Sequence, residues 1–292
     1  MKISKRTLGI VYILLSAFCF TLMNTFVRLS GELPSIQKSF FRNFIAVIFA
    51  FIILKKNGLP VKPSDKSNIK FLIIRSVMGT LGILCNFYAV DHLVLSDASM
   101  LNKMSPFFAV IFSLIFLKEK VTPFQVGAVI TAFIGALFII KPSFENISLV
   151  PALIGFIGGM GAGAAYTAVR HLGQKGEKGP FIVFFFSAFS CVVTLPYLIF
   201  NYHHMSLWQL VCLLLAGLSA SGGQFSITAA YCCAPAKEIS VYDYSQVVFS
   251  AVLGYFIFNQ LPDGYSFIGY FLIIATAVIM FLYNRKRASA QK

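Results

Sequence analysis

The sequence predicts an all-α integral membrane protein of ten transmembrane helices, built as two inverted repeats of five helices each. The first observation behind this prediction is composition, because 58% of the 292 residues are hydrophobic, 12% are charged and the mean hydropathy is +0.81. Soluble domains contain about 45–50% apolar and about 25% charged residues. The other two observations are a series of long apolar runs and an internal repeat.

The apolar runs are each long enough to cross a bilayer. A helix needs roughly 20 mostly apolar residues to span about 30 Å of hydrocarbon. Ten such runs lie between charged or Pro/Gly-rich breaks, at residues 7–28, 36–54, 70–90, 97–117, 122–140, 149–170, 180–200, 207–233, 240–258 and 264–284.

Basic residues fall mostly on one set of alternate loops. The net charge of +14 would suggest nucleic acid as a partner of a soluble chain, but here it follows the positive-inside rule. Both termini and the lysine-rich loop after residue 54 belong to the basic side. We therefore expect a multi-pass protein of the cell membrane with cytoplasmic termini and no nucleic-acid partner.

Two segments 142 residues apart share a pattern. Residues 25–31 read TFVRLSG and residues 167–173 read TAVRHLG. We divide the chain into a first repeat at 1–142, with spans 1–5, and a second at 143–292, with spans 6–10, together forming one bundle. Because five is odd, the second repeat must enter the membrane from the opposite face, and inverted repeats are typical of secondary transporters.

Aligning the later parts of the two repeats at an offset of 140 exposes two charge-swapped pairs. Asp97 falls opposite Lys237, and Lys103 falls opposite Asp243. A charge at membrane depth costs at least about 2.5–3.5 kcal/mol, so it normally faces a partner or a water-filled cavity. Lys103 and Asp243 are therefore candidates for substrate binding and for gating. The alternative is that they snorkel, or pair only to stabilise the bundle.

Other polar side chains inside the runs could line a cavity. An amide in the middle of a span needs a partner across helices or in water, and a buried tyrosine hydroxyl also needs one. The candidates for substrate binding are Asn24, Asn86, Tyr88, Asn102, Tyr166, Gln224, Tyr242 and Tyr244, together with Lys103 and Asp243. Arg42 and Arg75 lie near the ends of their runs, so we interpret them as snorkelling anchors. The glycines at 158–163 favour a packing seam over a site.

Six cysteines lie inside predicted spans, and four histidines lie near helix ends. Neither type shows the spacing of metal ligands, so we expect no metal and no cofactor.

The stretches FYAV at 87–90 and LSDAS at 95–99, followed by Pro106, FLKEK at 116–120 and Gly127, resemble the EamA domain of the drug/metabolite transporter superfamily. The resemblance covers nearly the whole chain as two EamA-like repeats, and the first repeat matches better. It implies ten helices in inverted repeats, a cavity lined by spans 1, 3, 4, 6, 8 and 9, and a metabolite cargo.

These features together predict a secondary transporter of a small polar or amphipathic organic solute, amino-acid-like or otherwise zwitterionic or aromatic. We expect alternating access, with export or exchange of the solute. Asp243 is the candidate for proton coupling, because a carboxylate in a closed apolar cavity can alternate between charged and neutral forms; a counter-substrate is the other coupling partner considered. A channel, a lipid scramblase and a membrane-embedded transferase are the alternatives, and the last would need clustered carboxylates or a nucleophile with a base.

Overall fold

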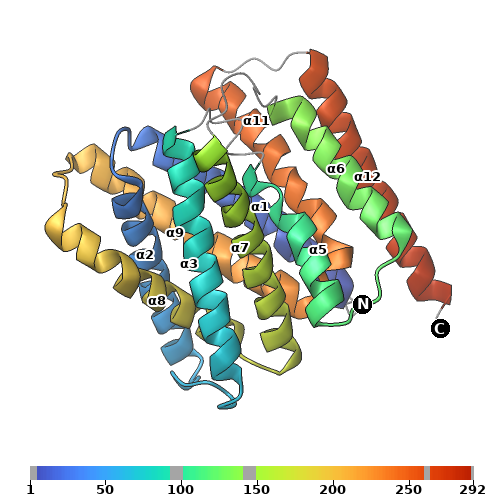
Figure 1. The fold of residues 1–292 in the computed structure, drawn as a ribbon, viewed down its shortest axis with the longest axis horizontal. Coiled ribbons are helices and arrows are strands. Elements are labelled where there is room, and N and C mark those ends of the chain that lie inside the picture. Colours follow the sequence, from blue (N-terminus) through green and yellow to red (C-terminus); the bar gives the residue numbers. More distant parts are fainter. Residues whose placement is uncertain (1–4, 93–100, 141–148, 260–263, 291–292) are drawn as a thin grey trace.

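The computed structural model describes residues 5–92, 101–140, 149–259 and 264–290, and every regular element in these ranges is a helix. Figure 1 shows the helices as one bundle with both chain ends at its lower edge, which we call the terminal end. The elements are α1 (Lys5–Leu29), α2 (Ser35–Lys56), α3 (Asn68–His92), α5 (Ser105–Phe116), α6 (Pro123–Ile140), α7 (Leu149–Gln174), α8 (Gly179–Phe200), α9 (Leu207–Cys233), α10 (Ala236–Ile239), η1 (Ser240–Tyr244), α11 (Ser245–Phe258) and α12 (Gly264–Ala290).

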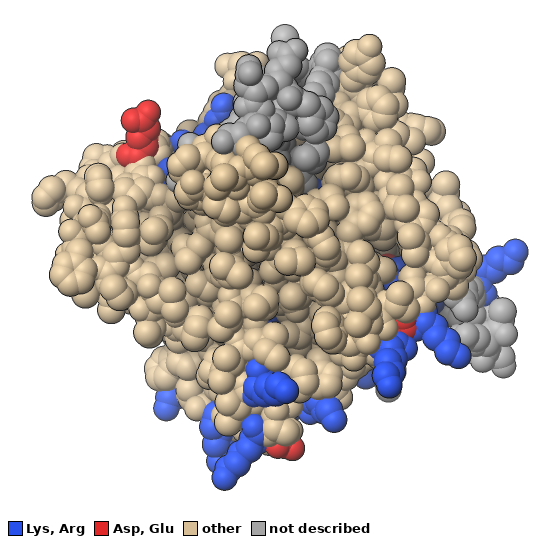
Figure 2. All heavy atoms as spheres, in the orientation of Figure 1, with Lys and Arg blue, Asp and Glu red and all other residues tan. Residues whose placement is uncertain are grey.

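The helices match the predicted membrane spans closely. Among the described residues, nine helical segments have the length and hydropathy to cross a membrane, and α5 is a shorter apolar helix. Large apolar side chains cover the outside of the bundle; Phe116 and Phe256, for example, are 70% and 74% exposed. Figure 2 shows a broad uncharged face, with most of the visible lysines and arginines gathered toward the terminal end. This is the surface of a protein that is surrounded by lipid.

Two spans are not continuous α-helices. In span 4, Lys103 lies in a turn and α5 begins two residues later. In span 9, α10 gives way to the 3₁₀ segment η1, which contains Asp243, before α11 begins. The predicted apolar runs at 97–117 and 240–258 contain these breaks, which the run lengths did not indicate. Both breaks lie at charged residues, and span 9 has the lowest hydropathy of the candidate spans among the described residues.

The main helix pairs each join one half of the chain to the other. Helix α1 packs on α9, α3 on α7, α2 on α8, and α6 on α12. Span 1 (α1) corresponds to span 6 (α7), and span 3 (α3) corresponds to span 8 (α9). The pair of α1 with α9 is therefore the counterpart of the pair of α7 with α3. The other two pairs join a span to its own counterpart. A two-fold relation between the halves produces this pattern.

Glycines of α7 allow this helix to approach two neighbours. A Cβ on Gly158 would lie 3.0 Å from Cβ of Cys85 in α3, and one on Gly163 would collide with Phe108 and lie 2.9 Å from the amide nitrogen of Ala109 in α5. The predicted packing seam is therefore present, with α3 and α5 against different faces of α7.

We expect Gly163→Ala to destabilise the bundle by about 1–3 kcal/mol, because the added methyl group would clash with backbone atoms of α5. The measurement is thermal unfolding of the purified protein in detergent. Gly127→Ala on α6 is the matched control, because a Cβ there meets nothing within 4 Å. Removal of a helical glycine should leave the control at least as stable as the original protein. An equal loss of stability in both variants would contradict the packing seam.

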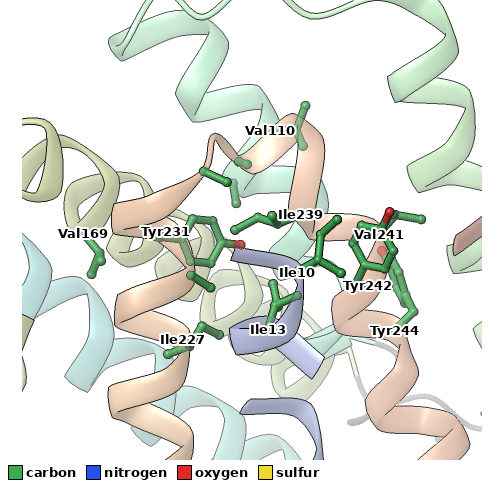
Figure 3. Packing of buried hydrophobic residues seen from close by; sticks show 14 of the residues in the cluster. Ile10, Ile13, Val110, Val169, Ile227, Tyr231, Ile239, Val241, Tyr242 and Tyr244 are labelled. Carbon is green, nitrogen blue, oxygen red and sulfur yellow. The ribbon is translucent and has the colours of Figure 1, made fainter. Parts of the chain in front are cut away.

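A cluster of buried apolar side chains lies near the terminal end. It joins Ile10 and Ile13 of α1 with Tyr231 of α9 and Ile239 of α10, as Figure 3 shows. Ile13, Tyr231 and Ile239 are almost fully buried. This cluster packs elements of both halves of the chain together.

Candidate functional site

The centre of the candidate site is an ion pair between the two halves of the chain. Nζ of Lys103 lies 3.3 Å from Oδ2 of Asp243, and both side chains are buried. Lys103 lies in the turn before α5 and Asp243 in η1, so the two partners occupy the breaks in spans 4 and 9. We call these residues the central pair. Discontinuous helices near the middle of the membrane are where transporters commonly bind their substrates.

Neighbouring polar groups hold the central pair in place. Lys103 donates a hydrogen bond of 2.6 Å from Nζ to Oε1 of Gln246, and the Tyr244 hydroxyl donates to the Lys103 carbonyl at 3.1 Å. The hydroxyl of Thr21 in α1 donates to the Gln246 carbonyl at 3.3 Å. The arrangement therefore connects α1, the turn before α5, η1 and the start of α11.

Electrostatics make the central pair sensitive to anything that changes either charge. Two charges removed from water lose several kcal/mol of hydration each, and their attraction repays that cost only while both are present. A proton on Asp243, or a charged group of a substrate beside either partner, would change this balance. The geometry thus supports a gate or a binding contact as readily as a structural pair.

Two further buried charges inside the bundle are arginines. Arg42 of α2 is 6% exposed and Arg75 of α3 is 2% exposed, so the expectation that they snorkel to the membrane surface is wrong. Both side chains turn into the bundle. Arg75 donates from Nη2 to Oε1 of Gln224 at 3.1 Å and lies over the Phe186 ring, with Cζ 3.9 Å from its centroid. Arg42 donates from Nε to the sulfur of Met23 at 3.2 Å.

Tyr166 of α7 lies within electrostatic range of Arg42, Arg75 and Asp243. Its ring stacks on Tyr231 of α9, with centroids 5.0 Å apart. The predicted need of Gln224 for a partner across helices is confirmed, because that partner is Arg75. These contacts join polar side chains of α2, α3, α7, α9 and η1 around one region.

The remaining predicted residues are less closely grouped. Asn24 and Tyr88 are exposed, Asn86 and Asn102 are half-buried, and Tyr88 stacks on His92. Tyr242 is buried beside the apolar cluster. Their substrate-binding roles stay predictions. Asp97, which the repeat aligns with Lys237, lies outside the described residues. Lys237 donates to the Lys120 carbonyl.

Three residues of this region were not predicted as site residues: Gln246, Arg42 and Arg75. A signal for the arginines was present, because each lies seven residues inside its helix, at Ser35–Lys56 and Asn68–His92. The insertion cost that singled out Lys103 and Asp243 applies equally to them. In residues 5–92, 101–140, 149–259 and 264–290, no group of three His, Cys, Asp or Glu side chains is placed to hold a metal ion.

Comparison with known proteins gives this geometry a context. The model of the EamA-like transporter family matches residues 7–141 and again residues 149–282. The chain is 30% identical to the pseudopaline exporter CntI of Pseudomonas aeruginosa, over 93% of this chain and 95% of the relative. It is 25% identical to an S-adenosylmethionine uptake transporter of Rickettsia bellii, over 98% and 97%. A crystal structure of a protein 15% identical superposes with a TM-score of 0.82, covering 95% of this chain and 98% of the other, so the fold is shared.

Proposed function

Since the chain belongs to the EamA-like transporter family, we propose that it is a secondary transporter that carries a small polar or amphipathic organic metabolite by alternating access. The observation that carries the proposal is the central pair. Lys103 and Asp243 are 140 residues apart, each lies at a break in its span, and together they join the two family repeats. A contact between repeats that can form and break is what rocking of one repeat against the other requires.

In this proposal the two repeats, at 1–142 and 143–292, are inverted, and both termini lie in the cytoplasm of a cell whose plasma membrane holds the protein. The support is the gathering of basic side chains toward the terminal end, together with the pairing of corresponding helices. The cargo is amino-acid-like, zwitterionic or aromatic. It contacts the central pair and the nearby Tyr166 and Gln224.

We assign the direction as export or exchange. The relative that is 30% identical over nearly its whole length is named an exporter. Relatives named for S-adenosylmethionine and riboflavin carry different metabolites, so cargo identity varies within similar sequences. Protons or a counter-substrate would drive the cycle.

The test is counterflow in liposomes that contain the purified protein. Vesicles loaded with an unlabelled amino acid, dicarboxylate or nucleoside are diluted into a trace of the same labelled compound. A carrier gives a transient, saturable accumulation of label for one compound of the panel. A channel or a scramblase gives no accelerated exchange, and conversion of the label into a new compound would indicate an enzyme.

Asp243→Asn tests proton coupling. Asparagine still accepts a hydrogen bond from Lys103 but cannot take up a proton, so we expect transport to lose its dependence on external pH and to slow by about 10-fold or more. Uptake of the compound identified by counterflow is measured from pH 5.5 to 8.5. Glu32→Gln, at an exposed acid, is the control. Full activity with an unchanged pH profile in Asp243→Asn would remove Asp243 from the coupling role.

A further inference from the structure

Arg42 and Arg75 carry more buried positive charge than the described protein around them neutralises. Neither guanidinium forms an ion pair with a carboxylate of the described residues. Nη1 of Arg42 and Nε of Arg75 are buried without any hydrogen-bond partner. An isolated buried charge is among the costliest features that a membrane protein can carry, and it usually marks a functional site.

Three acids of the described bundle have other cations as partners. Asp243 pairs with Lys103, so the central pair is neutral and adds nothing to balance the arginines. Glu238 pairs with Arg6, and Glu119 with Arg170. Among the described residues, the central pair and the two arginines together therefore carry a net charge of +2.

The surroundings of the arginines position them without neutralising them. Arg75 is held by the amide oxygen of Gln224 and by the face of Phe186, both of which are uncharged. Arg42 lies between the Met23 sulfur and the Phe20 ring, 6.0 Å from its centroid. Such contacts orient a guanidinium while leaving N–H groups available, and arginine is the side chain best suited to bind oxyanions through paired N–H donors.

We propose that Arg42 and Arg75 form an anion subsite of the transport pathway and that the cargo is a small metabolite with at least two negative charges on carboxylate or phosphate oxygens. The inference rests on the proposed transport function and names its substrate class. A dianion neutralises the excess charge of +2. An amino group on the same cargo would find its counter-charge at Asp243, which lies within electrostatic range of Tyr166 as both arginines do.

The experiment measures thermal stabilisation of the purified full-length protein in detergent at constant ionic strength. The probes are succinate, citrate and inorganic phosphate, with succinamide as the uncharged analogue of succinate. We expect at least one dianion to raise the melting temperature by about 5 °C at a concentration 100-fold above its dissociation constant, and succinamide to have no effect. The two kinds of probe distinguish a carboxylate cargo from a phosphate cargo.

Variants test whether the arginines are responsible. Arg42→Gln and Arg75→Gln should each reduce the dianion-induced shift by at least half. Lys55→Gln, which removes one positive charge at an exposed position of the same helix as Arg42, should leave it unchanged. If the glutamine variants do not fold, Arg75→Lys keeps the charge but removes the paired donors, and it should weaken the shift.

Two results would overturn the inference. One is equal stabilisation by succinate and succinamide in the unmodified protein, and the other is a full dianion shift in both glutamine variants. Counterflow distinguishes the absence of an anion subsite from the absence of transport. Exchange of a neutral solute alone would leave a transporter without an anion subsite, whereas no counterflow with any compound would reject transport itself.

Discussion

Lys103→Met is expected to lower the stability of the folded protein by about 3–5 kcal/mol and to abolish transport. Methionine has nearly the length of lysine but no charge, so Asp243 would remain buried without its counter-ion, and Gln246 would lose its 2.6 Å hydrogen bond. The measurement is thermal unfolding in detergent, where such a loss corresponds to a fall of roughly 10 °C.

A charge swap gives the sharper form of this test. Because positions 103 and 243 correspond in the two repeats, Lys103→Asp combined with Asp243→Lys places the same two charges on exchanged spans. We expect each single substitution to be severe and the double variant to recover part of the lost stability, so that a double-mutant cycle gives a coupling energy of about 1–3 kcal/mol. Additive losses would show that the contact contributes nothing as an ion pair.

The positions of the spans could be predicted because membrane insertion is encoded in local composition. The predicted run 207–233 coincides with α9, and the predicted runs 180–200 and 122–140 lie within one residue of α8 and α6 at each end. Charged or polar residues, or a proline, mark the ends of these helices. No tertiary contact is needed to place them, since lipid alone imposes the requirement for about 20 apolar residues.

Internal symmetry singled out the central pair of the site, and polarity within the spans singled out other residues. The offset of 140 placed Lys103 opposite Asp243, and the two side chains are in contact. No such offset relates Arg42 to Arg75. Whether an arginine near the end of an apolar run snorkels or turns inward depends on which helix face it occupies in the bundle. A run that is apolar on all sides gives no pattern from which that face can be predicted. Gln246 was missed for the same reason.

Glu119→Gln is expected to favour conformations that are open at the terminal end. Three contacts close that end between the two halves of the chain: Arg6 with Glu238 at 2.8 Å from Nη2 to Oε1, Arg170 with Glu119 at 3.0 Å from Nε to Oε1, and Lys237 with the Lys120 carbonyl. Arg170 also donates to the carbonyl of Cys232 at 3.3 Å. A charged hydrogen bond is worth about 1.5–3 kcal/mol, so its loss should raise the population of the open state by about 10-fold or more.

Cys232 is a native reporter of this opening, because it is half-buried and its carbonyl accepts from Arg170. We expect a membrane-impermeant maleimide, followed by mass spectrometry of each cysteine, to label Cys232 about 10-fold faster in Glu119→Gln, with no change at Cys191 of α8. Glu32→Gln, an exposed acid between α1 and α2, should change neither rate. Faster labelling at both cysteines would mean general unfolding. An unchanged rate at Cys232 would mean that the ion pair of Arg170 and Glu119 stabilises all conformations equally, and gating would then depend on the central pair.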